Sequence, residues 1–192
     1  SYLKAHPEVN EVILSGGDPL MADDQALSGL FVRLESVSSI HRLRIHTRLP
    51  IVIPERVTDT LCQIIAATAL PVVMVLHSNH ANEIDQSVMD AVSQLRVVCR
   101  SVLNQSVILK GINDSADVLI ALSERLFEAG IDPYYLNVLD RVSGAHHFDV
   151  SDLEVAALHQ ALLNALPGYL VPKLVREVPG IGHKVQWKGT TH

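Results

Sequence analysis

Two glycines and an acid directly follow a short apolar run near the start of the sequence. Val12–Leu14 has the composition of a buried strand, and Gly16, Gly17 and Asp18 come just after it. Glycines after a strand let the backbone approach a ligand that a β-carbon would block, and a carboxylate there stands at the strand's carboxyl end, where parallel α/β folds gather their sites. A tight turn from strand to helix, with no ligand, is the alternative interpretation.

A lysine near the other end of the sequence follows a loop that contains two glycines. Lys184 comes shortly after Pro179-Gly-Ile-Gly182. A lysine amine can form a Schiff base with an aldehyde cofactor when its surroundings favour the uncharged form. The pattern therefore indicates a candidate nucleophile. The alternative is an ordinary solvated charge.

Other polar residues fall at or near the ends of predicted strands. They are His77, His80, Gln105, Asp140 and Glu177. If the strands are parallel, their carboxyl ends meet on one rim, and these side chains would surround one mouth. The two acids could hold a cationic substrate group, and the buried amide of Gln105 needs hydrogen-bond partners that a polar ligand could supply. Helix capping by the histidines and simple salt bridges for the acids are the alternatives.

The residues that could ligate a metal are few. Cys62 and Cys99 lie far apart in the sequence, and we interpret them as free, buried thiols in a reducing compartment. His77 and His80 with Glu83 offer three donors, but nothing else clusters with the spacing typical of zinc sites. We therefore assign no metal ligand in this chain.

The composition bounds the class of protein. The chain has 192 residues, 48% of them hydrophobic and 19% charged, with a net charge of −6. A soluble globular domain, or part of a larger one, fits these values. The negative charge and the lack of a Lys and Arg run argue against nucleic-acid binding. No apolar run approaches the roughly 18 residues of a membrane span, and no signal peptide is present, so we expect a cytoplasmic protein.

Short runs rich in β-branched residues alternate with amphipathic stretches of helical length. This alternation predicts right-handed βαβ units and a parallel sheet, and five units are too few for a closed eight-stranded barrel, so the sheet is open or the barrel is partial. The predicted strands are Val12–Leu14, Arg42–His46, Val72–His77, Val97–Leu103 and Tyr134–Val138. The predicted helices are Asp24–Val37, Pro54–Ala67, Asn82–Leu95, Ser115–Ala129 and Ser151–Leu166, with Tyr169–Arg176 a last extended segment before the loop Glu177–Lys184.

Five stretches are specific enough, taken together, to indicate a family. They are Val12–Leu20, which contains Ser-Gly-Gly-Asp-Pro-Leu, then Arg44–Arg56, His77–Glu83, Leu103–Asp114 and Pro133–Asp140. In this order, over nearly the whole chain, they resemble the lysine 2,3-aminomutase family of radical S-adenosylmethionine enzymes, and most of all the branch that makes (R)-β-lysine for elongation factor P. The resemblance implies that residues 1–192 are the C-terminal portion of a single radical S-adenosylmethionine (β/α) barrel domain, without a second domain.

The resemblance also implies roles for individual residues. It implies that S-adenosylmethionine is bound by Gly16, Gly17, Asp18, His77 and Gln105. It implies that Lys184 binds pyridoxal 5'-phosphate covalently, through the family's Pro-Gly-x-Gly-x-Lys pattern. Asp140 and Glu177 match acids that bind the ε-ammonium of the substrate. After the lysine, Val185–Lys188 departs from the family's Thr-Pro.

The implied activity is that of an isomerase, an intramolecular aminotransferase that converts L-lysine, (S)-α-lysine, to (R)-β-lysine with a radical and pyridoxal phosphate. The family's Cys-x-x-x-Cys-x-x-Cys motif for the [4Fe–4S] cluster lies upstream of the Gly-Gly-Asp turn. Cys62 and Cys99 match no cluster position, so we expect the cluster only in an intact protein, with this chain an incomplete fragment. A reductant for the cluster, lysine, and elongation factor P with its lysyl ligase are the implied partners.

Three alternatives stay open at this point. The chain could be a truncated remnant that at most binds pyridoxal phosphate or S-adenosylmethionine, and the missing cysteines favour that interpretation. It could act on another amino acid, such as glutamate, although two acids facing the side chain favour a cation. It could also be an ordinary Schiff-base lyase on a barrel, which would need Lys184 but no iron.

Overall fold

The computed structural model describes residues 2–140, 146–178, 180–182 and 184–187. They group into two compact units, one made of Ser1–His77 and Asp85–Leu103 and the other of Ser78–Ile84 and Asn104–His192. Strand β4 (Ser101–Val107) begins in the first unit and ends in the second. None of the helices in the described ranges is both long enough and apolar enough to cross a membrane.

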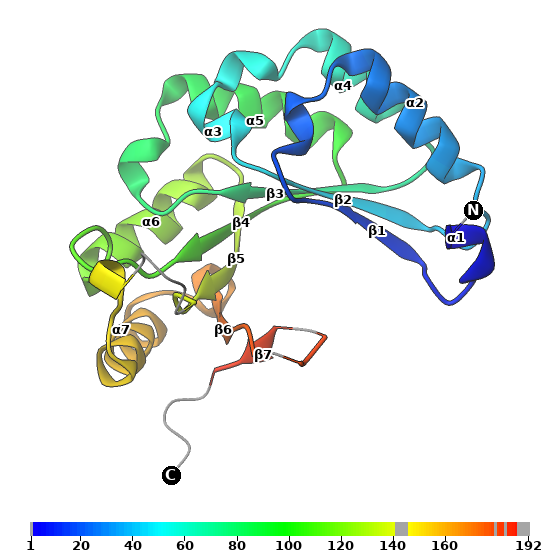
Figure 1. Cartoon of the computed structure of the whole chain (residues 1–192). Helices are drawn as coiled ribbons and strands as arrows, with labels where there is room; N and C mark the ends of the chain where they lie inside the picture. The colour runs from blue at the N-terminus through cyan, green and yellow to red at the C-terminus, as the bar shows by residue number, and fades with distance from the viewer. Residues whose placement is uncertain (1, 141–145, 179, 183, 188–192) are drawn as a thin grey trace. The chain divides into compact units, whose positions relative to one another are not determined.

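The first unit is a set of parallel strands with helices on one side (Figure 1). Strand β1 (Glu11–Leu14) pairs with β2 (Arg42–Thr47), and β2 pairs with β3 (Val72–His77). The helical elements are α1 (Tyr2–Ala5), η1 (Pro19–Met21), α2 (Asp24–Glu35), α3 (Leu49–Val52), η2 (Pro54–Arg56), α4 (Asp59–Ala67) and α5 (Gln86–Val98).

Side-chain alternation along the strands separates a core face from an open face in this unit. In β2, Leu43 and Ile45 are fully buried, whereas Arg44 and His46 are only half-buried. The buried strand residues pack with the apolar stripes of the helices, and each such leucine contributes about 1.5–3 kcal/mol on burial. The buried helix residues include Leu27 and Phe31 of α2, Leu61 and Ile65 of α4, and Val92 and Leu95 of α5.

The second unit holds the end of β4 and the strands that follow it. Strand β5 (Asp132–Asn137) pairs in parallel with β6 (Lys173–Arg176), and β6 pairs antiparallel with β7 (Val185–Gln186). The helical elements are η3 (Ala81–Glu83), α6 (Ala116–Glu128), η4 (His146–Phe148), α7 (Asp152–Ala165) and η5 (Gly168–Leu170). The core contains Ile108, Leu119, Leu136, Val138, Val150, Val155, Leu158, Leu162, Leu166, Leu170 and Leu174.

A buried polar network ties the start of the second unit to β4. The amide of Asn104 accepts from the Ser78 amide nitrogen at 2.8 Å and donates to the Ser78 carbonyl at 3.0 Å. Asn113, which is fully buried, donates to the carbonyls of Asn79 and Val107 at 2.9 Å. Because every buried polar group needs a partner, this network specifies where the segment after β3 lies against β4.

The predicted fold class is confirmed: parallel strands alternate with helices through five βα units, and an extended segment follows. The predicted extended segment Tyr169–Arg176 was too long, because Gly168–Leu170 form η5 and only Lys173–Arg176 is a strand. A strand start was also wrong, because Val97 and Val98 belong to the last turn of α5. Strand β4 starts at Ser101 instead and continues through Gln105. The cause is packing: Ala91, Val92 and Leu95 bury one stripe of α5, and the helix carries its next two β-branched residues with it.

Candidate functional site

The turn after β1 depends on glycine for its backbone conformation. Gly16 and Gly17 have φ angles of 79° and 55°, in the left-handed region that disfavours any residue with a β-carbon. A β-carbon added at either position would meet no atom within 4 Å. The requirement is therefore conformational, and both residues leave open space above the turn.

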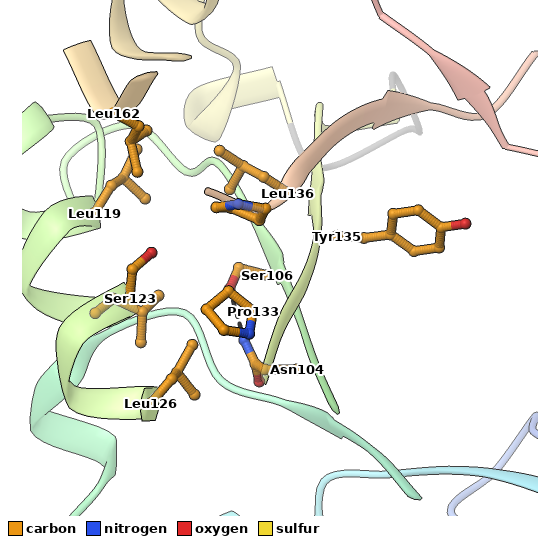
Figure 2. A pocket seen from close by; sticks show the side chains of 11 residues that line it. Asn104, Ser106, Leu119, Ser123, Leu126, Pro133, Tyr135, Leu136 and Leu162 are labelled. Atoms are coloured by element: carbon orange, nitrogen blue, oxygen red, sulfur yellow. Dashed lines mark hydrogen bonds between the residues drawn. The ribbon is translucent and has the colours of Figure 1, made fainter. Parts of the chain in front are cut away.

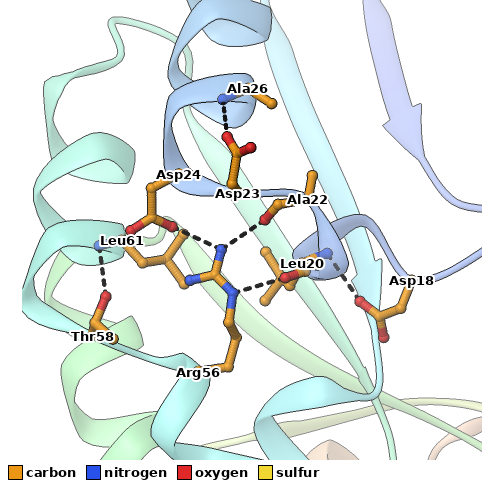
Figure 3. A network of polar contacts seen from close by, with 9 residues as sticks. All are labelled: Asp18, Leu20, Ala22, Asp23, Asp24, Ala26, Arg56, Thr58 and Leu61. Carbon is orange, nitrogen blue, oxygen red and sulfur yellow. Dashed lines mark hydrogen bonds and ion pairs between the residues drawn. The ribbon is translucent and has the colours of Figure 1, made fainter.

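The carboxylate of Asp18 holds this turn by four hydrogen bonds. Oδ1 accepts from the Leu20 amide at 3.0 Å and from the Thr47 hydroxyl at 2.6 Å. Oδ2 accepts from the Arg48 amide at 2.7 Å and the Leu49 amide at 3.2 Å. One side chain thus caps the start of η1 and, from a distant part of the sequence, the start of α3 (the first of these bonds is drawn in Figure 3).

A second network secures the chain that leads away from the turn. Figure 3 shows the guanidinium of Arg56 pointing at the η1 and α2 start: it donates to the Leu20 carbonyl at 2.7 Å and the Ala22 carbonyl at 3.1 Å, and pairs with Asp24 at 2.8 Å. Arg56 was not predicted as a site residue. Its place in one of the five matching stretches was the only signal available from the sequence.

The ends of β2 and β3 bring two histidines together in the first unit. The rings of His46 and His77 meet edge to face, with centroids 5.8 Å apart and an interplanar angle of 77°. Both are half-buried. The Gly-Gly-Asp turn follows the carboxyl end of β1, and His77 is at the carboxyl end of β3. These two parallel strands flank β2, so the first unit places both features at one edge of its strands, as predicted.

Lys184 lies against β5 in the second unit. Its amine donates to Asn137 Oδ1 at 2.5 Å and lies 3.3 Å from Glu177 Oε1. The amine is also 5.7 Å from the centroid of the Tyr135 ring. The side chain is 24% exposed, so its amine is only partly solvated and remains reachable. These contacts hold the amine beside β5 and leave part of its surface accessible.

The other predicted residues of the second unit occupy varied places. Glu177 is well exposed and contacts Lys184, and Asp140 is exposed just after β5. Gln105 is half-buried and lies on the opposite face of β4 from the buried side chains of Asn104 and Ser106. Asn137 is the contact residue that the sequence did not reveal, because its partner is 47 residues away.

His80 and Glu83 act as caps. The ring nitrogen Nδ1 of His80 accepts from the Asn82 amide at 3.1 Å, and Glu83 accepts from the amides of Asn79 and His80 at 2.6 and 2.9 Å. The two side chains form a capping box at η3. Within the described ranges, no three His, Cys, Asp or Glu side chains are grouped so that they could hold a metal ion.

The two thiols do not fit an iron–sulfur cluster. Burial raises the pKa of Cys99 to about 12, with the neighbouring Cys62 a smaller cause. Burial first, and then the charge of Asp59, raise the pKa of Cys62. Within the described ranges, neither thiol belongs to a group of three or more His, Cys, Asp or Glu side chains that could hold a metal ion.

The enclosed pocket of the second unit is a packing feature (Figure 2). It lies between the buried face of β4 and helix α6, and its lining includes Leu119, Leu122 and Leu126. The two polar side chains that β4 contributes, Asn104 and Ser106, are bonded to each other and to the Ser78 carbonyl. None of the predicted site residues lines this pocket.

Sequence comparison finds close relatives. Proteins named L-lysine 2,3-aminomutase from Haemophilus influenzae and Escherichia coli are 53% and 52% identical over 183 and 179 residues, which are 95% and 93% of this chain. One from Buchnera aphidicola is 47% identical over 184 residues. The chain spans about half the length of these relatives, 54%, 52% and 54% respectively. No protein-family model matches the chain.

Structure comparison supports the fold. The chain resembles SuiB of Streptococcus suis, solved bound to S-adenosylmethionine, with a TM-score of 0.60 and 16% identity. The match covers 88% of this chain and 39% of SuiB. At this identity the similarity shows the fold alone, an α/β fold with a curled, mainly parallel sheet.

Proposed function

We propose that this chain is part of an isomerase that moves the amino group of lysine from C2 to C3. Nearly the whole chain matches proteins named L-lysine 2,3-aminomutase, over about half the length of each of them. The observation that carries the proposal is the 47–53% identity to three proteins of that name. The product would be β-lysine, destined for elongation factor P and its lysyl ligase in the cytoplasm. The two free cysteines are compatible with that reducing compartment.

Lys184 is the proposed site of pyridoxal phosphate. Bound there, the cofactor would supply an aldehyde carbon for the migrating nitrogen and a ring that stabilises an unpaired electron. The amine of Lys184 fits this use because it is half-buried, reachable and held by Asn137. The chain's own contribution is to hold the Lys184 amine in one position, which lowers the entropic cost of bringing it to the aldehyde carbon.

The Gly16–Gly17 turn is the proposed S-adenosylmethionine contact, with His77 and Gln105 as further contacts. S-adenosylmethionine together with a reduced [4Fe–4S] cluster would supply the radical that starts the migration. The open backbone of the two glycines supports this proposal, since nothing lies within 4 Å of where their side chains would stand. We propose that the cluster ligands belong to the part of the relatives' length that this chain does not span, and that a separate reductant serves the cluster.

Asp140 and Glu177 are the proposed partners of the substrate's ε-ammonium. Both are exposed acids of the second unit, and Glu177 lies 3.3 Å from the amine of Lys184, so a carboxylate stands beside the proposed cofactor site. Two carboxylates favour lysine over glutamate, because a glutamate side chain would meet like charge. This charge preference is the basis for choosing lysine as the substrate.

The test is an anaerobic assay of the full-length protein with S-adenosylmethionine, pyridoxal phosphate, a reductant and either lysine or glutamate. We expect β-lysine from lysine only. Lys184→Ala should abolish both the product and the label trapped by borohydride, since it removes the amine. Lys173→Ala is the matched control, because Lys173 is an exposed lysine on β6 with no assigned role, and it should retain both.

The outcomes separate the candidates. Label on another lysine, or product from Lys184→Ala, would contradict the assignment of Lys184. Turnover that survives complete removal of iron would favour a Schiff-base lyase. Binding of both cofactors without any product would favour a remnant that only binds ligands, the second candidate, which the presence of only two cysteines in this sequence keeps open.

A further inference from the structure

Asn137 makes two hydrogen bonds that together fix the orientation of its amide. Its Nδ2 donates to the Ser106 carbonyl at 2.9 Å, and its Oδ1 accepts from the Lys184 amine at 2.5 Å. Only the amide nitrogen can donate to a carbonyl, and only the amide oxygen can accept from an ammonium group. The two partners therefore agree on a single orientation, with the oxygen toward Lys184.

The backbone of Asn137 is held as firmly as its side chain. Its carbonyl accepts from the Ile108 amide at 3.0 Å, and the residue is in register with Val175 on β6. Leu136, the preceding residue, is buried in the core of the second unit, so the strand cannot rotate without exposing it. Asn137 is thus a fixed acceptor on the face of β5 opposite to Leu136, which is the open face of this strand.

The remaining contacts of the Lys184 amine are weaker. Glu177 is 63% exposed at its side chain and lies 3.3 Å away, and a pair as solvated as this contributes little. Tyr135, two residues before Asn137 on the same face of β5, presents its ring 5.7 Å from the amine. Among the described residues, the shortest contact of the amine is therefore the one with Asn137.

We infer that Asn137 is a positioning residue for Lys184, holding its amine over the open face of β5 so that an aldehyde cofactor meets it in one orientation. This inference rests on the role proposed for Lys184. In the reaction with an aldehyde, the ammonium first releases one proton to solvent; the nitrogen then adds to the carbonyl carbon, and the carbonyl oxygen leaves as water with the two remaining nitrogen hydrogens. Asn137 neither gives up nor takes up a proton in this step, and it forms no covalent bond.

Two substitutions in the full-length protein separate positioning from a merely structural role. Asn137→Leu keeps the branched shape and the number of side-chain heavy atoms but lacks the acceptor for Lys184. Asn137→Asp keeps an acceptor for Lys184 but loses the donor to Ser106. If Asn137 only ties β5 to β4, both variants should change the reactivity of Lys184 equally. If it positions Lys184, only the leucine variant should change that reactivity. Far-UV circular dichroism and thermal unfolding report whether each variant is folded.

The first readout does not involve the cofactor. Trace acetylation with acetic anhydride, quantified by peptide mapping, compares Lys184 with Lys173 as an internal reference. Loss of a hydrogen bond of ordinary strength should release the amine and raise the relative acetylation of Lys184 about three- to tenfold in Asn137→Leu. Asn137→Asp should stay at or below the original value. Equal acetylation in the original protein and Asn137→Leu would overturn the inference, as would an equal rise in both variants.

The second readout is the distribution of pyridoxal phosphate trapped by borohydride. The original protein and Asn137→Asp should carry the label mainly on Lys184, whereas Asn137→Leu should spread it over other lysines. Unchanged selectivity in Asn137→Leu would also overturn the inference. If the original protein itself is labelled elsewhere, the role proposed for Lys184 fails, and the acetylation result still decides whether Asn137 holds the amine.

Discussion

At the scale of single residues, Asp18 fixes the conformation of the turn through more hydrogen bonds than its place in a short motif suggests. Four donors converge on its two oxygens, and three of them are backbone amides at the starts of η1 and α3. Such a carboxylate positions the glycines beside it, whatever else it contacts. Its contribution to the turn can be measured without any ligand.

Asp18→Asn should lower the free energy of unfolding by about 2 kcal/mol, because the new amide nitrogen would face N–H donors in place of an acceptor. Urea unfolding of the full-length protein measures this. Asp23→Asn is the matched control: Asp23 caps α2 through one bond to the Ala26 amide, and asparagine is an equally good cap. A loss at Asp18 no larger than that at Asp23 would contradict the positioning role.

His159 predicts a pH dependence of stability. Burial lowers its pKa below 6.5, and a hydrogen bond to the Pro172 backbone offsets part of this. The unfolded chain therefore binds more protons than the folded one as the pH falls below about 6.5, so stability is lost in that direction until the lower folded pKa is passed. His159→Gln should flatten this part of the curve.

The measurement is the urea midpoint at about pH 7.5 and 5.5, on either side of the ordinary histidine pKa. The original protein should lose more stability between the two values than His159→Gln does. His41→Gln changes an exposed histidine just before β2 and serves as the control. An identical loss in His159→Gln and the original protein would show that other groups cause the dependence.

At the scale of elements, several helix starts and ends were predictable because their signals are local, but the predicted start at Asn82 was wrong, because Ala81–Glu83 forms η3 and α5 begins only at Gln86. Ser151 and Glu154 form the predicted capping box, and Gly130 has the φ of 77° expected of a residue that ends a helix. Helix α3 was not predicted, because its four residues are capped by Asp18, about 30 positions away in the sequence. Strand β7 was missed for a similar reason: it is two residues long and exists through its pairing with β6.

Arg56 gives the prediction that belongs to this scale, since it joins η2 to the start of α2. Arg56→Lys should lower the free energy of unfolding by about 1–2 kcal/mol, because one ammonium cannot reach two carbonyls and a carboxylate in the geometry of a guanidinium. Arg33→Lys, at an exposed position in the last turn of α2, is the control and should be neutral. Equal effects of the two changes in urea unfolding would show that the fork geometry of Arg56 contributes nothing.

At the scale of the whole molecule, the alternation of strands and helices was sufficient to predict the fold class. The site could be predicted only in part. Asp18, His77 and Lys184 stand out by residue type and by position in the sequence, whereas Asn137 becomes meaningful only when β5 meets a residue 47 positions later. Contacts of this kind arise from tertiary packing, which local patterns do not encode.

The cysteines give the prediction for the whole protein. Cys62→Ser and Cys99→Ser should each leave the iron content of the reconstituted full-length protein unchanged, because within the described ranges neither thiol belongs to a group of side chains that could hold a metal ion. Alkylation with iodoacetamide near pH 8 is the companion measurement: Cys99 should react slowly in the folded protein and readily in urea. Loss of iron in either serine variant would show that a thiol of this chain is a cluster ligand.

The pairing of β6 with β7 has a consequence for how this site can vary. Arg176 pairs with Val185, so the segment that carries Glu177 and Lys184 starts and ends on neighbouring strand positions. The position of Lys184 is thus fixed by the pairing of β6 with β7 and does not depend on the length of the loop. Related chains could therefore differ in the length of that loop while the lysine keeps its place beside β5.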